Sequence, residues 1–354
     1  MAATKRNAPK QNGSLYDPAD RKSMIRALEA QRQSKVICFL TGMRPGAPST
    51  MAEDQVRIIF DHLLALKKRP IERLDIFLCS NGGSATVPWR LVSLFREFSK
   101  HFAVLIPYRA YSAATMLALG ADEIVMHPFG EMGPIDPTVS NEFNPKDEQT
   151  QQRLGISVED VKAYVTFIKQ TVGITHEEEL VRAIEILARK VHPLALGNVE
   201  RFLSQSRMMG RKIMRTHMSE SEEHTINDII ENLASKLFFH GHPINRKEAK
   251  QELRLKVADN VPSELETLMW DLYLNYELEL QNREVFNPMG DLAQVTGGVQ
   301  APKTIEYKIK HAVIESLGLK SHHETWRRFT EVQIPPNPFP QIKEDILFQG
   351  WIHS

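Results

Sequence analysis

The feature of this sequence that most limits its fold is an alternation of short apolar runs with amphipathic stretches. The apolar runs are "KVICFL" (35–40), "RLDIFLC" (73–79), "FAVLIPY" (102–108) and "EIVMHP" (123–128). Parallel strands that are covered on both faces form such continuous apolar runs, and helices connect them as right-handed crossovers. The sequence up to about residue 135 therefore predicts an α/β fold built from βαβ units.

The second half of the sequence has a different character. Residues 136–156 are polar and without periodicity, and amphipathic helical patterns then follow over 157–173, 175–190, 198–218, 225–239 and 264–280. Two strand-like runs, 304–316 and 325–334, are predicted to form a hairpin or edge strands. We therefore expect a mobile N-terminal arm (1–20), an α/β domain with a helical layer (21–260) and a C-terminal helix and strand extension (261–354).

Composition excludes several classes of protein. Lys+Arg and Asp+Glu both number 44 among the 354 residues, so no overall positive field favours nucleic acid as a partner. The two cysteines, Cys38 and Cys79, lie in apolar runs and indicate buried thiols rather than a disulfide framework. No apolar stretch approaches the length of a membrane span, and the polar N-terminus is unlike a secretory signal. We expect a cytoplasmic protein.

Two turns after apolar runs are the strongest candidates for a functional site. Gly82 and Gly83 follow the run that ends at Cys79, and Ser112 follows the run 102–108, at the start of an alanine-rich helix. The carboxyl ends of parallel strands are where open α/β sheets place their sites. Exposed main-chain amides at the glycines and at Ala113 can stabilise an oxyanion beside a serine hydroxyl. The alternative is that Ser112 is a helix cap and the glycines form only a tight turn.

These segments resemble a known family. "IFLCSNGG" (76–83), "AYSAATMLALGADEIVMHPFGEMGPIDP" (110–137), "KVHPLALGNVERF" (190–202) and "HPINRKEAK" (242–250) are similar to the serine dehydrogenase proteinase family. Those proteins are ClpP/crotonase-fold serine peptidases, related to signal peptide peptidase A and Clp protease. The resemblance spans about residues 30–260 and implies a ClpP/crotonase-like parallel βαβ spiral core.

The resemblance also implies roles for individual residues. Ser112 would be the nucleophile, and the amides of Gly83 (or Gly82) and Ala113 would form the oxyanion hole. The chain would act on a peptide or protein substrate as an ATP-independent serine peptidase, without a cofactor. Members of this superfamily assemble into oligomers, so a homo-oligomer is expected. Relatives often have a membrane anchor or a membrane partner; because no anchor is visible here, a membrane role would need a membrane-protein partner.

A serine hydroxyl needs a base to activate it, and the sequence leaves three possibilities open. A Ser-His-Asp triad in the family's chain order would use Asp136 and His192. His127 is the second candidate, at the end of a neighbouring strand. Lys162 is the third, as in a Ser-Lys dyad, although helical periodicity places it on an exposed face and a lysine base requires burial.

Other interpretations of the sequence are also open. The same fold could be a catalytically inactive scaffold whose helices serve assembly, or a crotonase-type enzyme that acts on an acyl-thioester. No metal site is indicated: the pair His240 and His242 lacks a recognisable ligand set, and the pair His322 and His323 is predicted to lie in a hairpin loop.

Overall fold

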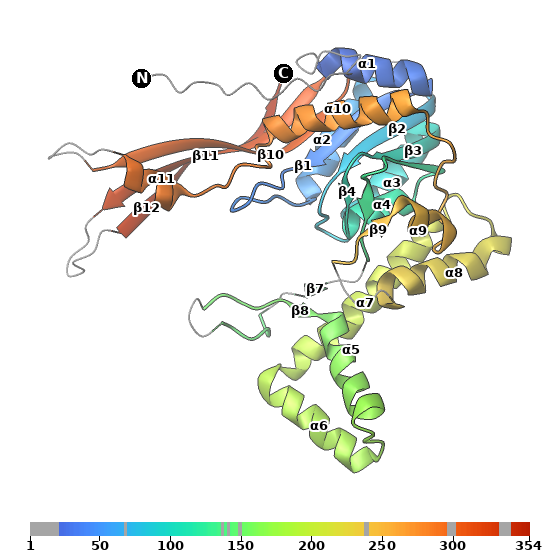
Figure 1. The fold of residues 1–354 in the computed structure, drawn as a ribbon, viewed down its shortest axis with the longest axis vertical. Coiled ribbons are helices and arrows are strands. Elements are labelled where there is room, and N and C mark those ends of the chain that lie inside the picture. The colour runs from blue at the N-terminus through green and yellow to red at the C-terminus, as the bar shows by residue number, and fades with distance from the viewer. Residues whose placement is uncertain are drawn as a thin grey trace. The chain divides into compact units, whose positions relative to one another are not determined.

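The computed structural model describes residues 21–66, 69–135, 138–139, 142–147, 151–236, 241–295, 302–332 and 341–354 (Figure 1). The chain forms two compact units. Unit 1 comprises Met1–Ser49, Arg73–Phe77 and Asp259–Ser354, and unit 2 comprises Thr50–Glu72 and Leu78–Ala258. Strand β2 (Ile71–Cys79) contributes its central residues to unit 1 and its ends to unit 2. The predicted domain boundaries at residues 20 and 260 remain predictions.

Unit 2 contains the predicted alternation of strands and helices. Its first elements are α2 (Glu53–Ala65), α3 (Val87–Phe98), β3 (Ser99–Ile106), β4 (Arg109–Ala110), α4 (Ala113–Leu119), β5 (Glu123–Met126) and β6 (Glu131–Met132). Strands β3 and β5 pair in parallel, from Ala103 beside Glu123 to Ile106 beside Met126. The side chains of β3 from Phe102 to Ile106 are fully buried. The predicted α/β class is confirmed, and the continuous apolar runs arise because these strands are covered on both faces.

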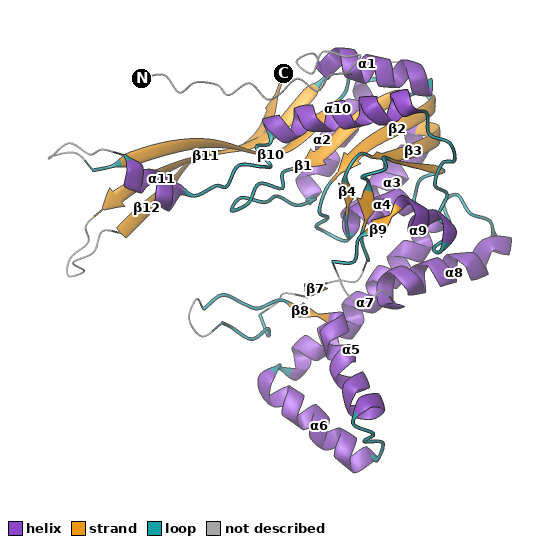
Figure 2. Ribbon diagram, in the orientation of Figure 1, coloured by secondary structure: helices purple, strands orange, loops and turns teal. Residues whose placement is uncertain are grey.

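The rest of unit 2 is mainly helical, as predicted (Figure 2). The elements are β7 (Thr138–Val139), β8 (Ile156–Ser157), α5 (Val158–Thr166), α6 (Glu177–Lys190), α7 (Pro193–Met214), α8 (Glu223–Glu231), β9 (Ile244–Asn245) and α9 (Arg246–Gln251). Helix α7 contacts both α4 and α8. Strands β4, β6 and β9 form a small sheet in that order, in which β4 and β6 are parallel. Strand β4 of this sheet is followed in the chain by α4.

Unit 1 combines two helices with an antiparallel sheet. Helices α1 (Arg21–Arg32) and α10 (Ser263–Glu279) lie side by side (Figure 1), and a short helix, α11 (Pro288–Gln294), follows. The strands β12 (Gln341–His353), β11 (Lys320–Val332), β10 (Thr304–Glu315) and β1 (Lys35–Thr41) are neighbours in that order. Strands β10 and β11 form the predicted hairpin, and β12 is an additional strand.

The prediction that His322 and His323 lie in a hairpin loop is wrong. Both residues are in β11, where they pair with Val313 and Ala312 of β10. The His323 ring packs against the ring of Trp351 on β12. The turn between β10 and β11 is earlier in the chain, at residues 316–319. Because histidine is compatible with a strand whose side chains pack on aromatic neighbours, the residue pair alone did not indicate a loop.

The cysteines are free and buried, as predicted. Cys38 and Cys79 are 0% and 1% exposed. Burial raises the pKa of the Cys38 thiol well above its ordinary value. Among the described residues, no helix is both long and apolar enough to cross a membrane.

A charged cluster around Glu279 joins α1, α10 and the hairpin of unit 1. Lys310 Nζ and Lys320 Nζ lie 2.7 and 2.8 Å from Glu279 Oε1, and Arg21 also pairs with this carboxylate. Arg21 Nη1 lies 3.0 Å from Glu315 Oε2. Burial alone would raise the pKa of Glu279, but Arg21, Lys310 and Lys320 together lower it to about 2.

We expect Glu279→Gln to destabilise the protein by about 3 kcal/mol at pH 7, because each unit of pKa shift corresponds to about 1.4 kcal/mol. The pKa of Glu279 is lower in the folded than in the unfolded protein, so its contribution is complete above pH 4.5 and is lost as the pH falls toward 2. Denaturant unfolding at pH 7 and pH 3 measures this difference. Glu264→Gln, an exposed change on the same helix, is the control. An equal loss of unfolding free energy in the Glu279→Gln and Glu264→Gln variants would contradict the prediction.

Candidate active site

The turn after β2 lies beside β4 through main-chain hydrogen bonds. The Ser80 amide donates to the Arg109 carbonyl (2.8 Å), and the Tyr111 amide donates to the Ser80 carbonyl (3.0 Å). The Gly82 amide donates to Ser80 Oγ (3.1 Å), so it is used within the turn. The two turns selected from the sequence, 80–83 and 111–113, are therefore neighbours in space.

Gly82 is in direct contact with the backbone around Ser112. Its φ is +93°, and a Cβ at this position would lie 2.6 Å from the Tyr111 carbonyl oxygen, 2.9 Å from Ser112 Cβ and 3.0 Å from the Ala113 nitrogen. Two of these three neighbours are backbone atoms, which cannot move aside as the end of a flexible side chain can. Glycine is required here because it alone permits both this φ and this close approach.

Gly83 is a glycine for a different reason. A Cβ on Gly83 would lie 2.2 Å from the Met51 carbonyl oxygen. The backbone of Met51 lies alongside the turn. The Met51 amide donates to the Gly82 carbonyl (2.7 Å), and the Ser84 amide donates to the Met51 carbonyl (2.8 Å). Gly83 is exposed, and its own amide has no hydrogen-bond partner in the described part of the chain. Met51 was not identified from the sequence, since it is distant from the turn and carries no polar group.

Ser112 joins β4 to α4 in a strained conformation. Its φ is +52° and its ψ is −113°, in a region that non-glycine residues rarely occupy. Ser112 is the N-cap residue of α4, but its side chain makes no capping hydrogen bond. The alternative interpretation, that this serine serves as a helix cap, therefore lacks the hydrogen bond that defines one. The half-buried hydroxyl has no hydrogen-bond partner among the described residues.

The Ala113 amide lies at the start of α4. It is the first residue of the helix, so its N–H has no partner within the helix, and none of the described residues accepts from it. Two main-chain amides, those of Gly83 and Ala113, are thus available in the two turns that meet at Ser112. Such donors stabilise the negative charge that develops on a carbonyl oxygen under nucleophilic attack.

Several contacts fix the residues on either side of Ser112. The buried Thr115 hydroxyl lies 2.6 Å from the Ala110 carbonyl oxygen and 2.8 Å from that of Gly133. The Tyr111 hydroxyl donates to Glu131 Oε1 (2.7 Å), which also accepts from Arg109 (2.8 Å). Burial, followed by Glu131, raises the pKa of Tyr111 well above its ordinary value, so the phenol stays protonated and keeps this hydrogen bond.

Thr115 and Glu131 were not selected from the sequence. The available signal was their position: Thr115 follows Ser112 by one helical turn, and Glu131 precedes the "GPIDP" turn. Thr115 binds main-chain carbonyls on either side of the site, whereas Glu131 binds the side chains of Arg109 and Tyr111. The contacts of Thr115 with Gly133 and of Glu131 with Tyr111 join residues 18 and 20 positions apart, so local spacing does not reveal them. Only the small sheet of β4 and β6 brings Glu131 beside Tyr111.

The two candidate histidines are not hydrogen-bonded to Ser112 in the described structure. His127 Nδ1 accepts from the Phe129 amide (3.0 Å), just after β5. His192 is the N-cap of α7; its Nδ1 accepts from the Leu194 amide (3.2 Å), and its ring stacks on Phe143. A neutral ring whose Nδ1 accepts carries its proton on Nε2, whereas a triad histidine carries it on Nδ1. Each ring would have to rearrange to take a proton from Ser112 through Nε2.

The remaining predicted residues are only partly described. Asp136 lies outside the described residues, and Lys162 lies in α5 but its side chain is not described. His240 also lies outside the described residues. His242 Nε2 lies 2.7 Å from Glu248, so this histidine has an acidic neighbour that the sequence did not indicate. Within the described ranges, no cluster of three potential ligands could hold a metal ion.

A comparison with known protein families finds a match within the first half of the chain. Residues 10–160 match the model of a family described as ClpP-like SDH-type serine proteinases. The resemblance predicted from the sequence is confirmed. The matched region contains both glycines of the turn, Ser112 and Ala113, and it supports a serine peptidase at the level of the family.

Two uncharacterised proteins of Methanocaldococcus jannaschii are similar to this chain. MJ0137 is 25% identical over 260 residues, which cover 72% of this chain and 78% of that protein. MJ1495 is 30% identical over 122 residues, which cover 32% of this chain and 41% of that protein. Among solved structures, a mutant of the membrane-bound stomatin-specific protease 1510-N aligns with 66% of this chain and 84% of its own, at 12% identity and a TM-score of 0.35.

Proposed function

We propose that this chain is an ATP-independent serine peptidase that cleaves peptide bonds through an acyl-enzyme on Ser112. The observation that carries the proposal is the contact of Gly82 with Ser112, by which the turn that contains Gly83 lies beside this serine. Ser112 has a strained backbone at the start of α4, and its side chain makes no capping hydrogen bond. Strain at a residue between strand and helix exposes a nucleophile and is characteristic of functional positions. The match to a serine proteinase family over the same residues supports it.

The proposed reaction is acyl transfer. Ser112 Oγ attacks the peptide carbonyl carbon and loses its proton to a base, and the Gly83 and Ala113 amides donate to the resulting oxyanion. The carbon–nitrogen bond then breaks, and the base returns the proton to the leaving amine. Water hydrolyses the ester in the same manner and regenerates the serine. The Gly82 amide, which donates to Ser80, takes no part in this scheme.

The test is hydrolysis of an unfolded protein by the purified full chain, without nucleotide and with and without a fluorophosphonate. We expect hydrolysis that the fluorophosphonate abolishes. Hydrolysis that is insensitive to this reagent, or that requires ATP, would contradict the proposal.

The substrates of the proposed peptidase would be peptides or unfolded proteins. A homo-oligomeric state, a membrane-protein partner and a cytoplasmic location remain predictions.

The base is proposed to be His192, with Asp136 as its partner, or else His127 or Lys162. We expect one of His192→Gln, His127→Gln and Lys162→Met to lower the rate of acylation by roughly a hundredfold or more, the usual effect of losing a general base. Inhibition by a fluorophosphonate, followed over time, measures that rate. The control is His224→Gln, because the His224 side chain is 88% exposed. Unchanged rates in all three variants would exclude these candidates.

A further inference from the structure

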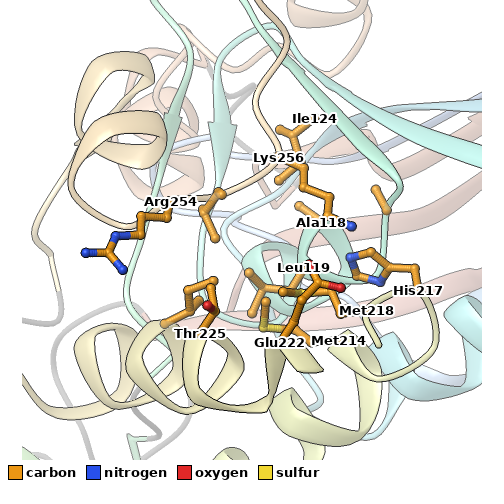
Figure 3. Close-up of a pocket in the computed structure, with 13 residues that line it drawn as sticks. Ala118, Leu119, Ile124, Met214, His217, Met218, Glu222, Thr225, Arg254 and Lys256 are labelled. Carbon is orange, nitrogen blue, oxygen red and sulfur yellow. The ribbon is translucent and has the colours of Figure 1, made fainter. Parts of the chain in front are cut away.

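A small pocket in unit 2 is lined by Ala118 and Leu119 at the end of α4 (Figure 3). Ser112 precedes the start of the same helix, so the pocket is at the other end of α4. Its volume is about 90 Å³, and it is bounded by the end of α4, the end of α7 and the turn after it, α8 and the extended segment 254–256. That segment runs beside β5: the Ile124 amide donates to the Lys256 carbonyl (2.8 Å). All of these elements belong to unit 2. Helix α4 has seven residues, so its two ends are roughly 10 Å apart.

One part of the pocket wall is apolar. Leu119, Ile124, Met214 and Met218 line it. An apolar cavity of about 150 Å³ holds a benzene ring, so a volume of 90 Å³ suits a smaller group such as the branched side chain of leucine. Methionine side chains adapt to the shape of such a group.

The other part of the wall carries a cation and an unsatisfied polar atom. The Lys256 ammonium and the His217 ring lie on the same side of the pocket, whereas the Arg254 guanidinium points away from them (Figure 3). Lys256 Nζ forms no ion pair or hydrogen bond with any described residue. His217 Nδ1 is buried and has no hydrogen-bond partner within the described ranges. Six described side chains have such an atom, and His217 is the one among them that lines this pocket, where a bound group could satisfy it.

The charges around the pocket favour an anion. Burial, and then the cations Lys256 and Arg96, lower the pKa of His217 to about 4, so the ring is neutral at pH 7 and can donate one N–H. Glu222 is the acidic residue of the lining, and its carboxylate already accepts from the Ser219 amide (2.9 Å) and hydroxyl (3.0 Å). Arg96 is paired with Asp122. Lys256 also lowers the pKa of Glu222 through its charge, but no ion pair or hydrogen bond joins Lys256 to a described residue. Its ammonium is therefore the cation of the lining that faces the pocket and can pair with a ligand.

We propose that this pocket is a second binding site, which takes an aliphatic carboxylate. The branched aliphatic chain lies against Leu119, Ile124 and Met214. The carboxylate pairs with the Lys256 ammonium and accepts a hydrogen bond from the His217 ring after a small rotation of that ring. The ligand can be a free branched-chain acid or the C-terminal carboxylate of a peptide whose last residue is leucine-like. The site is separate from Ser112, and its existence does not depend on the proposed peptidase activity.

The test uses the full chain carrying Ser112→Ala, so that no turnover occurs, and ¹³C-methyl methionine NMR. Resonances of Met214 and Met218 are assigned with Met→Leu variants at each position. We expect 4-methylpentanoate to shift both methyl resonances saturably, and 4-methylpentanamide to bind about tenfold more weakly, because an ionic hydrogen bond is lost. Lys256→Gln should weaken binding of the acid by a similar factor. Thr225→Leu, which fills the pocket from α8, should abolish binding.

The control is Lys247→Gln, an exposed lysine on α9 outside the pocket, which should bind the acid as the parent does. Titration with acetyl-Gly-Leu and with its C-terminal amide distinguishes the two sources of the ligand. Binding of this peptide acid identifies a C-terminus as a ligand, and binding of 4-methylpentanoate alone identifies a free acid. The proposal would be overturned if neither 4-methylpentanoate nor acetyl-Gly-Leu caused a saturable shift, or if an acid and its amide bound equally.

Discussion

The Ser112→Ala variant is expected to lose peptide hydrolysis by roughly four orders of magnitude or more, which is the effect of removing the nucleophile from a serine peptidase. The change removes only the hydroxyl oxygen. Because Ser112 Oγ makes no hydrogen bond with any described residue and does not cap α4, the fold should be unaffected. Alanine also retains the main-chain amide of residue 113, so substrate binding and the oxyanion hole should remain.

Steady-state hydrolysis of an unfolded protein measures this loss, and thermal unfolding shows whether the variant is folded. The matched control is Ser204→Ala, since Ser204 is an exposed serine on α7 whose hydroxyl contacts only Glu200 among the described residues. That variant should keep full activity. A folded Ser112→Ala protein with undiminished hydrolysis would show that another residue is the nucleophile.

The Gly82→Ala variant is expected to lower the rate of acylation by roughly a hundredfold or more, the effect of misplacing one oxyanion-hole donor. The added methyl group would lie 2.6 Å from the Tyr111 carbonyl oxygen and 3.0 Å from the Ala113 nitrogen. These are backbone atoms, so the turn and the start of α4 must separate. The distance between the two proposed donors would change, although no functional group has been removed.

A second glycine separates this steric effect from the effect of backbone conformation. Gly173 has a φ of +83°, close to the +93° of Gly82, but a Cβ there would meet no atom within 4 Å. Gly173→Ala should therefore cost only the strain of a left-handed residue, about 1–2 kcal/mol in stability, and leave acylation unchanged. If both glycine variants acylate at the parental rate, the close contact at Gly82 has no role in catalysis.

The sequence predicted the layered α/β part of the fold because that information is local. The run 102–108 is continuous and apolar, and β3 is indeed buried on both faces, with Phe102 to Ile106 at 0% exposure. The hairpin of β10 and β11 was also predicted, although its strands mix polar and apolar residues and are only partly buried. The third strand, β12, was not predicted. Its sequence "QIKEDILFQGWIH" mixes charged and apolar residues, and it forms a strand through pairing with β11.

The candidate site was predicted less completely because its contacts join distant segments. The sequence indicated that Gly82, Gly83 and Ser112 belong together, but it gave one explanation for both glycines. In the structure, Gly82 makes room for Ser112 and Ala113, whereas Gly83 makes room for Met51. The base could not be chosen from residue types, because activation depends on which ring nitrogen faces the hydroxyl.

The central claim, that Ser112 is an activated nucleophile, is tested most directly by locating a fluorophosphonate adduct. The full chain is labelled in its folded state, digested and analysed by mass spectrometry. We predict a single adduct on Ser112, which is absent when the protein is unfolded before labelling and strongly reduced in Gly82→Ala. An adduct on a different serine, or a folded protein that remains unlabelled, would contradict the claim.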